Sequence, residues 1–294
     1  MQAQDRRRFT APEGASPLRF SDSPATPAAS TSSSSSPRAD GRQPGQVRPV
    51  FLQPGLVSEA AGSAYIEAGR TKVLCAVYGP KPTPPSAPFN AKARLNVEVK
   101  FAPFASGVRR FVPGKDTEAT ALASTLQQAL VPAILLEHMP KSQIDLFVTV
   151  LESDGWDGDL SIGVTAASTA LAEAGIPMRG LVTGCSAALL PSSPSTSSAP
   201  SSASTTPLAL LDPTRLEARA AQSFLTLSCL PALGTSTSVR VNGVVDPQSL
   251  SETLTKMYDV CGLLHGVAKE ALLTSAAAAA AAESAAAAAG AGAA

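Results

Sequence analysis

The chain has 294 residues, with 23 basic and 23 acidic side chains, so its formal net charge at pH 7 is zero. Residues 1–50 contain seven Arg and four acidic residues, a formal +3, and the remaining 16 basic and 19 acidic residues give −3. An acidic folded part argues against an autonomous nucleic-acid binder. Since the chain shows neither a long apolar run before its alanine-rich end nor an apolar signal segment, we expect a soluble intracellular protein.

Three segments have biased compositions that are not expected to contribute to a hydrophobic core. Residues 1–47 are rich in Ser, Pro, Ala and Arg and predict a disordered head, and residues 191–207 form a Ser/Thr/Pro-rich insertion. Residues 274–294 are an alanine-rich tail, in which the alanines up to Ala289 are able to extend a preceding helix. The folded part is therefore expected to be one domain over residues 48–273.

The rest of the chain alternates runs of strands with helices, which predicts an α+β fold. The patterns predict strands at residues 48–52, 62–67, 71–78, 94–101, 144–151, 181–190, 208–211, 224–230 and 238–245. Helices are predicted at residues 116–137, 161–174 and 247–273.

Local signals set the expected ends of several elements. Gly79-Pro80 is expected to end the third strand, and Asn242-Gly243 is a hairpin signal. Asp116 is a good N-cap for the long helix, which Pro132 is able to bend. The second helix has small side chains on its inner line and is expected to pack closely against a sheet, with Gly175 at its C′ position.

An acidic turn precedes the second predicted helix. A strand–loop–helix junction normally offers free N–H groups to an anion such as phosphate. Here Asp154, Asp157 and Asp159 occupy that place, where they are expected to cap the helix and to repel phosphate. The junction therefore predicts a ligand site that is closed by its own sequence.

Other chemistry has weaker support. The three aspartates do not match a calcium-loop spacing, so capping is favoured over metal binding. Trp156 is expected to anchor packing or an interface rather than to stack on a base. Only His138 and His265 are available to a nucleophilic triad, which is disfavoured. The four cysteines lack a CxxC pair and predict buried free thiols; they are Cys75, Cys185, Cys229 and Cys261.

Seven segments together resemble one family, the RNase PH-like subunits of the RNA exosome. They are residues 48–50, 62–69, 71–77, 79–80, 101–104, 170–178 and 211–217. Residues 62–65 and 211–217 are most similar to the subgroup of ring subunits named for mRNA transport regulation. The resemblance implies an RNase PH-like fold, with mixed β-sheets packed against helices.

The same resemblance implies lost catalysis. Active members cleave RNA from its 3′ end with phosphate, which requires cationic groups to hold the phosphate and acids at the cleaved bond. The resemblance places the family's Gly-Thr-Arg or Gly-Ser-Arg clamp at residues 158–160, where Asp159 and Leu160 replace the hydroxyl residue and the arginine. The family's catalytic acids fall at Ala218 and Phe224, with Ser223 as the alternative for the second. We therefore expect no catalytic residue, metal ion or cofactor.

Two functional roles for charged residues remain open: a relocated catalytic acid and a set of RNA contacts. Glu217 lies one residue from the first acid position and is the candidate for a relocated acid. The resemblance places several basic residues toward the mouth and wall of a ring's central channel, where they would hold an RNA backbone. These RNA-contact candidates are Lys81, Lys92, Arg94, Arg109, Arg110 and Lys115.

The sequence therefore predicts a non-catalytic subunit of the exosome core ring. The resemblance implies that its partners are other RNase PH-like subunits in a hetero-hexameric ring, cap subunits with OB-fold RNA-binding modules, RNA in the channel and a separate exoribonuclease. It implies a location in the nucleus and nucleolus and also in the cytoplasm. The alternatives are an active phosphate-dependent 3′ exoribonuclease and a free-standing RNA-binding protein.

Overall fold

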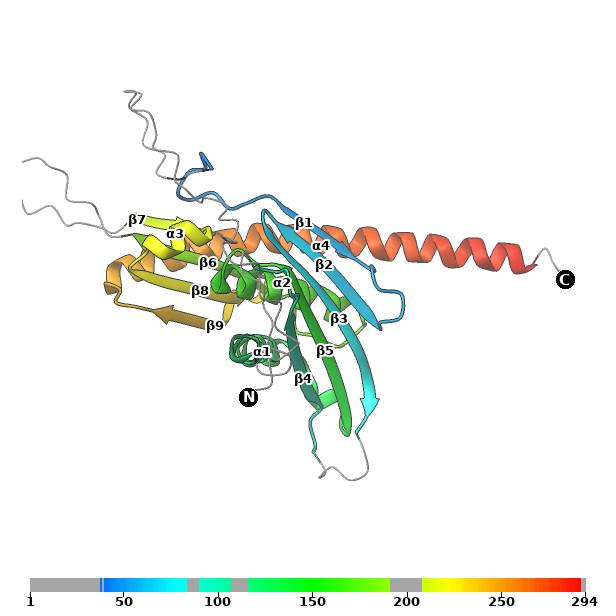
Figure 1. Cartoon of the computed structure of the whole chain (residues 1–294). Helices are drawn as coiled ribbons and strands as arrows, with labels where there is room; N and C mark the ends of the chain where they lie inside the picture. The colour runs from blue at the N-terminus through cyan, green and yellow to red at the C-terminus, as the bar shows by residue number, and fades with distance from the viewer. Residues whose placement is uncertain (1–37, 39, 84–89, 107–115, 191–207, 292–294) are drawn as a thin grey trace, which may run out of the picture. The chain divides into compact units, whose positions relative to one another are not determined.

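A computed structural model describes residues 38, 40–83, 90–106, 116–190 and 208–291. These residues form two β-sheets, with helix α2 (Trp156–Glu173) lying between them (Figure 1). The predicted α+β class, with mixed β-sheets packed against helices, is confirmed. Across the part of the chain that the structure describes, no helix combines the length and the apolarity that a membrane span requires.

The first sheet has five strands in the order β1-β2-β3-β5-β4, and only the β4–β5 pair is parallel. Its strands are β1 (Val50–Pro54), β2 (Gly62–Ala68), β3 (Thr71–Pro82), β4 (Arg94–Phe101) and β5 (Ser142–Glu152). The predicted hairpin of β2 and β3 and the half-buried pattern of β4 are confirmed.

The expectation that Gly79-Pro80 ends β3 is wrong. The strand continues to Pro82, and its register with β5 shifts between Tyr78 and Lys81. Pro80 has no N–H to donate, so an irregularity in the ladder accommodates it without ending the strand.

Helix α1 (Thr117–Leu130) ends seven residues before the predicted end at Glu137. Asp116 caps its start as predicted, because the Asp116 side chain accepts hydrogen bonds from the N–H groups of Glu118 and Ala119. Two short 3₁₀ turns, Val131–Ala133 and Leu136–His138, follow in place of further helix. Pro132 thus ends the helix rather than bending it, since it cannot donate the next helical hydrogen bond.

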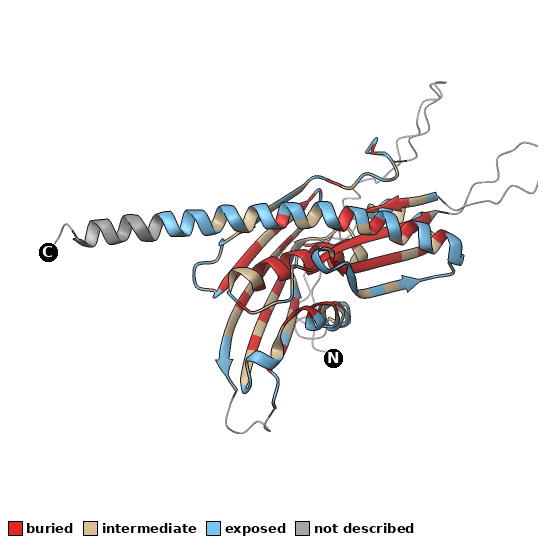
Figure 2. Ribbon diagram, turned by 180° about the vertical axis from the view of Figure 1, so that it is seen from behind, coloured by how far each residue is buried: buried red, intermediate tan, exposed pale blue. Residues whose placement is uncertain are grey.

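Helix α2 (Trp156–Glu173) begins five residues before the predicted start at Ser161. Every residue from Gly158 to Leu171 is buried. In Figure 2 the buried residues gather where the sheets and helices pack together. Gly175 follows with a φ of 69°, which fits its predicted C′ role. The helix is therefore buried on all sides and does not carry a single inner line.

One face of α2 packs through apolar side chains, and the other forms hydrogen bonds through hydroxyl groups. Val164, Ala167 and Leu171 belong to the apolar core under the first sheet. Toward the second sheet the helix presents hydroxyl groups instead: the Thr165 Oγ1 accepts from the Gly184 N–H at 3.1 Å, and the Ser168 Oγ accepts from the Val182 N–H at 2.7 Å. Small polar side chains let the helix approach that sheet closely.

The second sheet has four antiparallel strands in the order β7-β6-β8-β9. Its strands are β6 (Thr183–Leu190), β7 (Leu208–Leu211), β8 (Ser223–Leu230) and β9 (Thr235–Asn242). The hairpin prediction at Asn242-Gly243 is wrong: β8 and β9 are joined through Pro231–Leu233 and Gly234, and Gly243 leads out of β9 instead. Gly234 has a φ of 66° and supplies the left-handed turn.

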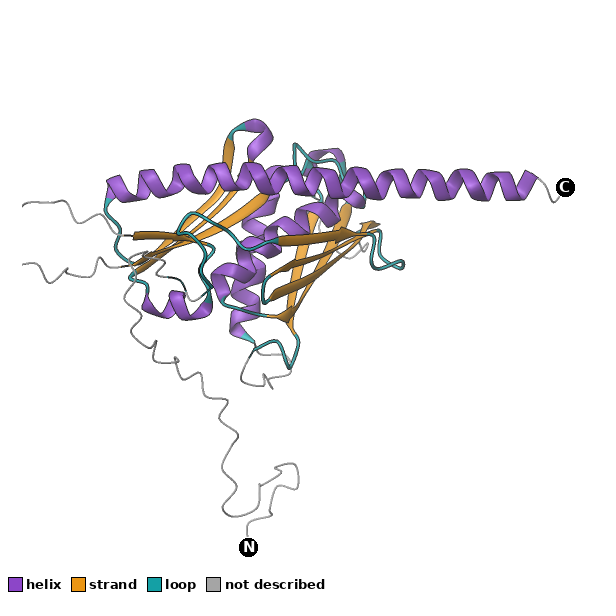
Figure 3. Cartoon of the chain, turned by 90° about the horizontal axis from the view of Figure 1, so that it is seen from above, coloured by secondary structure: helices purple, strands orange, loops and turns teal. Residues whose placement is uncertain are grey.

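Two helices complete this half. The short α3 (Arg215–Ala220) was not predicted, and α4 (Pro247–Ala291) packs an apolar stripe that includes Met257 and Cys261 on the second sheet. Asp246 caps α4 by accepting from the N–H groups of Gln248 and Ser249. The alanines do extend this helix, which runs past the sheets in Figure 3.

The predicted boundary at residue 48 is placed too late. Arg38 and Arg42 are buried, and the Leu211 N–H donates to the carbonyl of Pro44 at 2.9 Å, so the end of the predicted disordered head packs against β7. The rest of that head, apart from residues 40–47 and Arg38, and the insertion at 191–207 lie outside the described residues. The four cysteines are free and buried, as predicted.

Candidate functional site

The candidate site lies where β5 turns into α2. The expected capping by aspartates is wrong, because Gly155 is the N-cap and no side chain caps the helix. Each carboxylate has another partner instead. Asp154 binds the guanidinium of Arg48 at 2.9 Å, and Asp157 accepts a hydrogen bond from the hydroxyl of Thr226 at 3.2 Å. Asp159 accepts a hydrogen bond from the hydroxyl of Ser153 at 2.5 Å. These contacts help to hold the turn in place.

Arg48 supplies a buried cation at this junction. Its Nη2 lies 3.6 Å from the place that a Cβ on Gly158 would take, so the guanidinium sits beside the first turn of α2. Asp212 receives two hydrogen bonds from it, Nε to Oδ2 at 2.7 Å and Nη2 to Oδ1 at 2.5 Å. With Asp154 on Nη1, the guanidinium is bound by two carboxylates of the chain itself.

Two further arginines hold the same region. Arg42 lies 3.5 Å from the carboxylate of Asp212, and Arg38 forms an ion pair with Glu217 at 3.2 Å. Arg38 also donates to the carbonyl of Leu211. The segment before β1 therefore joins β7 and α3 to the acidic turn through arginine side chains.

Burial and charge act in opposite directions on the pKa values of these groups. Burial alone would raise the pKa of Asp212, but hydrogen bonds and charge from Arg48, together with the charge of Arg42, hold it below its usual value. Burial raises the pKa of Asp154 in spite of Arg48, and it raises the pKa of Asp157 in spite of Thr226. Asp212 is thus the carboxylate that the arginines stabilise most clearly in its charged form.

The predicted clamp positions face the interior. Leu160 is 2 % exposed and belongs to the apolar core of the first sheet, and Asp159 is 1 % exposed. A side chain at position 160 is directed into that core, where a charged group would be costly without a partner. In the described residues, cations beside the first turn of α2 come from Arg48 and Arg240 and not from the clamp position.

The predicted acid positions carry no acid that reaches the junction. Ala218 lies in α3, while Ser223 begins β8 and is buried. Alternation along β8 places Phe224 on the same side as Thr226, the residue that contacts Asp157. Phe224 therefore occupies the site-facing position at which the resemblance implies a carboxylate.

Glu217 has a structural task. Its carboxylate accepts from the Thr214 N–H at 2.9 Å while the Thr214 hydroxyl accepts from the Glu217 N–H, which is a capping box for α3. Arg38 binds the same carboxylate. The Thr-x-x-Glu spacing was the available sequence signal for α3 and for this role, and both were missed.

Of the described basic candidates, Lys81 on β3 and Arg94 on β4 both pair with Gln143 of β5, so they flank the same residue of the sheet. Lys81 lies 3.9 Å from Asp145, and Lys92 lies 2.8 Å from Glu137. Arg94 is exposed at the start of β4. The other three candidates, Arg109, Arg110 and Lys115, lie outside the described residues.

Trp156 packs against the core of the first sheet, and the guanidinium of Arg240 lies 4.2 Å from its ring centroid. One face of the indole is therefore covered from β9, which supports packing over base stacking at that face. Among the described residues, no group of three or more His, Cys, Asp or Glu side chains is arranged to hold a metal ion.

Three comparisons place the chain among known proteins. The profile of the 3′ exoribonuclease family, domain 1, matches residues 46–177. The exosome complex component MTR3 of Homo sapiens is 36% identical over 248 residues, which cover 80% of this chain and 86% of that protein. MTR3 of Mus musculus is 34% identical over 287 residues, covering 92% of this chain and 96% of that protein.

The fold comparison agrees. The crystal structure of rice (Oryza sativa) Rrp46 matches with a TM-score of 0.66 at 24% identity, covering 80% of this chain and all of that one. The exosome component Rrp41 of Methanopyrus kandleri is 32% identical over 238 residues, covering 80% of this chain and 91% of that protein. The chain therefore belongs to the RNase PH family, among relatives that are exosome complex components.

Proposed function

We propose that the chain is a non-catalytic subunit of the exosome core ring. In this role it assembles with other RNase PH-like subunits and supports 3′-to-5′ RNA processing and degradation that a separate exoribonuclease carries out. The kinship with the MTR3 proteins, over nearly the whole length of both chains, supports this assignment.

One observation carries the non-catalytic part of the proposal: Leu160 occupies the clamp position and is buried in the apolar core. A phosphate nucleophile would need a cation at that position. Of the cations that lie nearby, Arg48 already binds two carboxylates, so an incoming phosphate would have to displace Asp212 and Asp154 from it, and Arg240 stacks on the ring of Trp156. Both the charge and the geometry favour the internal ion pairs.

Glu217, the candidate for a relocated catalytic acid, already has structural contacts. Glu217 closes the capping box of α3 and pairs with Arg38, so its use as a catalytic base would break both contacts. No other acidic residue stands between Arg219 and Arg240 in the sequence. Phosphorolysis by this chain would therefore lack both the phosphate-binding arginine and the catalytic acids.

The proposed partners extend beyond the ring. We include OB-fold cap subunits and RNA in the channel, with Lys81, Lys92 and Arg94 as backbone contacts together with the candidates outside the described residues. Ion pairs at Lys81 and Lys92 are compatible with this role, because exposed pairs are weak and are readily exchanged for a phosphate. The proposed location is the nucleus and nucleolus, and also the cytoplasm.

Two experiments test the proposal. The purified chain is incubated with 3′-labelled and 5′-labelled RNA, with and without inorganic phosphate, beside an active RNase PH as a positive control. We expect no phosphate-dependent shortening, and shortening that requires phosphate would refute the non-catalytic role.

Assembly is tested separately. Affinity purification of the tagged chain from cells should recover other RNase PH-like subunits and OB-fold cap proteins. Recovery of the chain without any RNase PH-like subunit would contradict the ring assignment, and tight binding of RNA by the lone chain would favour a free-standing RNA-binding protein.

A further inference from the structure

Two of the four free cysteines lie against each other under helix α4. Cys229 belongs to β8 and Cys261 to α4, and both are buried in the core between the second sheet and that helix. Thr183 of β6 lies beside both: its Oγ1 is 4.0 Å from the Cys229 sulfur, and the Cys261 thiol donates to its carbonyl at 3.9 Å. A side-chain hydrogen bond also joins the two thiols directly.

Hydrogen bonding gives the two thiols different acidities. The hydrogen bond from the Cys261 thiol lowers the pKa of Cys229 in spite of burial, and Thr183 acts in the same direction. The same contact with Cys229, together with burial, raises the pKa of Cys261. Because the thiolate is the reactive form of cysteine, Cys229 is the more nucleophilic member of the pair.

Tyr258, one turn before Cys261 on α4, adds a second hydroxyl group near the pair. Within the part of the chain that the structure describes, its hydroxyl oxygen is buried and has no hydrogen-bond partner. Burial raises the pKa of Tyr258, and the charges of Cys229 and Cys261 act in the same direction, so the hydroxyl lies within electrostatic range of both sulfurs. A sulfur that became charged or oxidised would give this donor an acceptor, which a buried polar group normally has.

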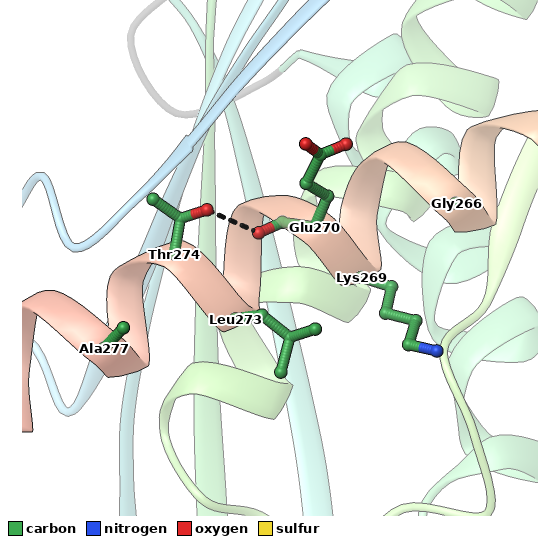
Figure 4. Close-up of a pocket in the computed structure, with 6 residues that line it drawn as sticks. All are labelled: Gly266, Lys269, Glu270, Leu273, Thr274 and Ala277. Carbon is green, nitrogen blue, oxygen red and sulfur yellow. Dashed lines mark hydrogen bonds between the residues drawn. The ribbon is translucent and has the colours of Figure 1, made fainter.

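The helix that covers the pair is weakened just after Cys261. Gly262 and Gly266 are exposed, and a Cβ added at either would meet nothing within 4 Å, so packing does not require a glycine there. Glycine inside a helix lowers its stability relative to alanine. From Gly266 to Ala277 the helix lines an open trough of about 500 Å³ (Figure 4). Local opening of α4 at this point gives a small solute access to the thiols.

We propose that Cys229 and Cys261 form a redox-active dithiol, which hydrogen peroxide converts to a disulfide that fastens α4 to β8. The Cys229 thiolate attacks one peroxide oxygen, the O–O bond breaks, and the other oxygen leaves as water with one added proton. Cys229 is then a sulfenic acid. When α4 closes, the Cys261 sulfur attacks the Cys229 sulfur, and the hydroxyl group leaves as water with the thiol proton. The two thiols lose two electrons, and one peroxide becomes two waters.

The contacts distinguish this pair from the other two thiols. Cys75 lies in the core of the first sheet, where burial raises its pKa. Cys185 shares the second core with the pair, but its thiol donates to the carbonyl of Ser186 at 3.7 Å, and burial raises its pKa as well. The disulfide should therefore join Cys229 to Cys261 alone. This property is an addition to the proposed ring function and does not depend on it.

Peptide mapping of the oxidised full-length chain is the first test. The reduced chain is treated with hydrogen peroxide under native conditions, and the remaining thiols are alkylated after denaturation. Trypsin places Cys229 and Cys261 in different peptides, residues 220–240 and 257–269. We expect these two peptides to be joined, with Cys75 and Cys185 still alkylated. The oxidised chain should melt roughly 5 °C higher, because the bond closes a loop of about 30 residues, and dithiothreitol should reverse the shift.

Substitution of one thiol tests the order of the steps. In Cys261→Ala the second step is blocked, so Cys229 should remain a sulfenic acid, which dimedone labels. Cys229→Ala should give several-fold less label at Cys261. Cys185→Ala, from the same core, is the matched control and should form the disulfide as the unmodified chain does. Thermal melting before oxidation establishes that each variant is folded.

The opening of α4 is tested by strengthening the helix. Gly262→Ala should slow disulfide formation roughly fivefold without changing the product, because alanine favours helix and its Cβ meets nothing within 4 Å. An unchanged rate would overturn the opening step. A folded chain that forms no disulfide, a crosslink that includes Cys185, or oxidation of Cys75 as fast as that of the pair would overturn the proposal.

Discussion

Arg48 and Asp212 lie 164 residues apart in the sequence and meet at the start of α2 through three hydrogen bonds: two from the guanidinium, of 2.7 and 2.5 Å, and one of 3.0 Å from the Arg48 backbone N–H. The contact joins the segment before β1 to the end of β7. Because both side chains are largely buried, each depends on the other to offset the loss of water.

Removal of one charge should therefore be severe. Asp212→Asn leaves Arg48 and Arg42 without the carboxylate that they share, and we expect a loss of about 3–5 kcal/mol in the free energy of unfolding. Urea denaturation measures it. Asp40→Asn removes an exposed partner of Arg42 and serves as the control, with an expected change below about 0.5 kcal/mol. Equal effects of the two variants would show that burial does not govern this ion pair.

The two kinds of buried carboxylate should give opposite pH dependences. The pKa of Asp212 is lowered in the folded chain, so its contribution is present above its unfolded pKa and is lost as the pH falls through the lower folded value. Asp212→Asn should therefore differ most from the unmodified chain at neutral pH, and the difference should shrink in acid. Denaturation curves from pH 7 down to about pH 3 follow it.

Asp157 should behave in the opposite way. Its pKa is raised by burial, so the charged form destabilises the fold at neutral pH, and this penalty disappears as the pH falls through the raised folded value. Asp157→Asn keeps an oxygen for the Thr226 hydroxyl and should be at least as stable as the unmodified chain at pH 7. Its advantage should diminish in acid, and a clear loss of stability at pH 7 would contradict this account.

Restoring the clamp residue alone should not restore activity. Leu160→Arg places a guanidinium in the apolar core, so we expect a loss of about 3–5 kcal/mol in the free energy of unfolding. It should gain no phosphate-dependent RNA cleavage, since Phe224 still occupies the site-facing position on β8. Thermal melting and the RNA assay are run together. Leu160→Met keeps the apolar volume and is the control.

Close contact between α2 and the second sheet predicts intolerance of a single methyl group. A Cβ on Gly184 would lie 2.4 Å from the carbonyl oxygen of Ser161, so Gly184→Ala should destabilise the fold by about 1–3 kcal/mol or more. Gly163→Ala, inside α2, meets only the Leu126 side chain at 3.5 Å and should be tolerated. Urea denaturation of both variants distinguishes steric exclusion from a general effect of replacing glycine.

Local patterns predicted much of the fold. Alternation located β4, and the Asp116 cap located the start of α1, because each signal acts within a few residues. The early start of α2 was missed, since the residues just before and in its first turn include aspartates whose partners, Arg48 for Asp154 and Thr226 for Asp157, are distant in the sequence. Burial of those polar groups overrides the local pattern.

The candidate site, like the fold, could be predicted from the sequence only in part. The family resemblance alone shows that the clamp arginine is replaced by Leu160, whereas the burial of Leu160 is visible only in the structure. The arginine cluster could not be predicted. Arg38 and Arg42 stand in a segment whose composition indicates disorder, and only their contacts with Leu211 and Asp212 show that it folds. Composition reports the average of a segment and does not identify the few side chains that dock.

The burial of α2 on all sides has a consequence for how the molecule comes apart. The helix lends apolar side chains to the core of the first sheet and hydroxyl groups to the backbone beside the second, so neither sheet can separate while α2 stays folded. Its central amides should consequently exchange with solvent only through global opening. Helix α4 also contacts both sheets, at β1 of the first and at β6 and β8 of the second. The two sheets should therefore melt in a single cooperative transition rather than as two independent halves.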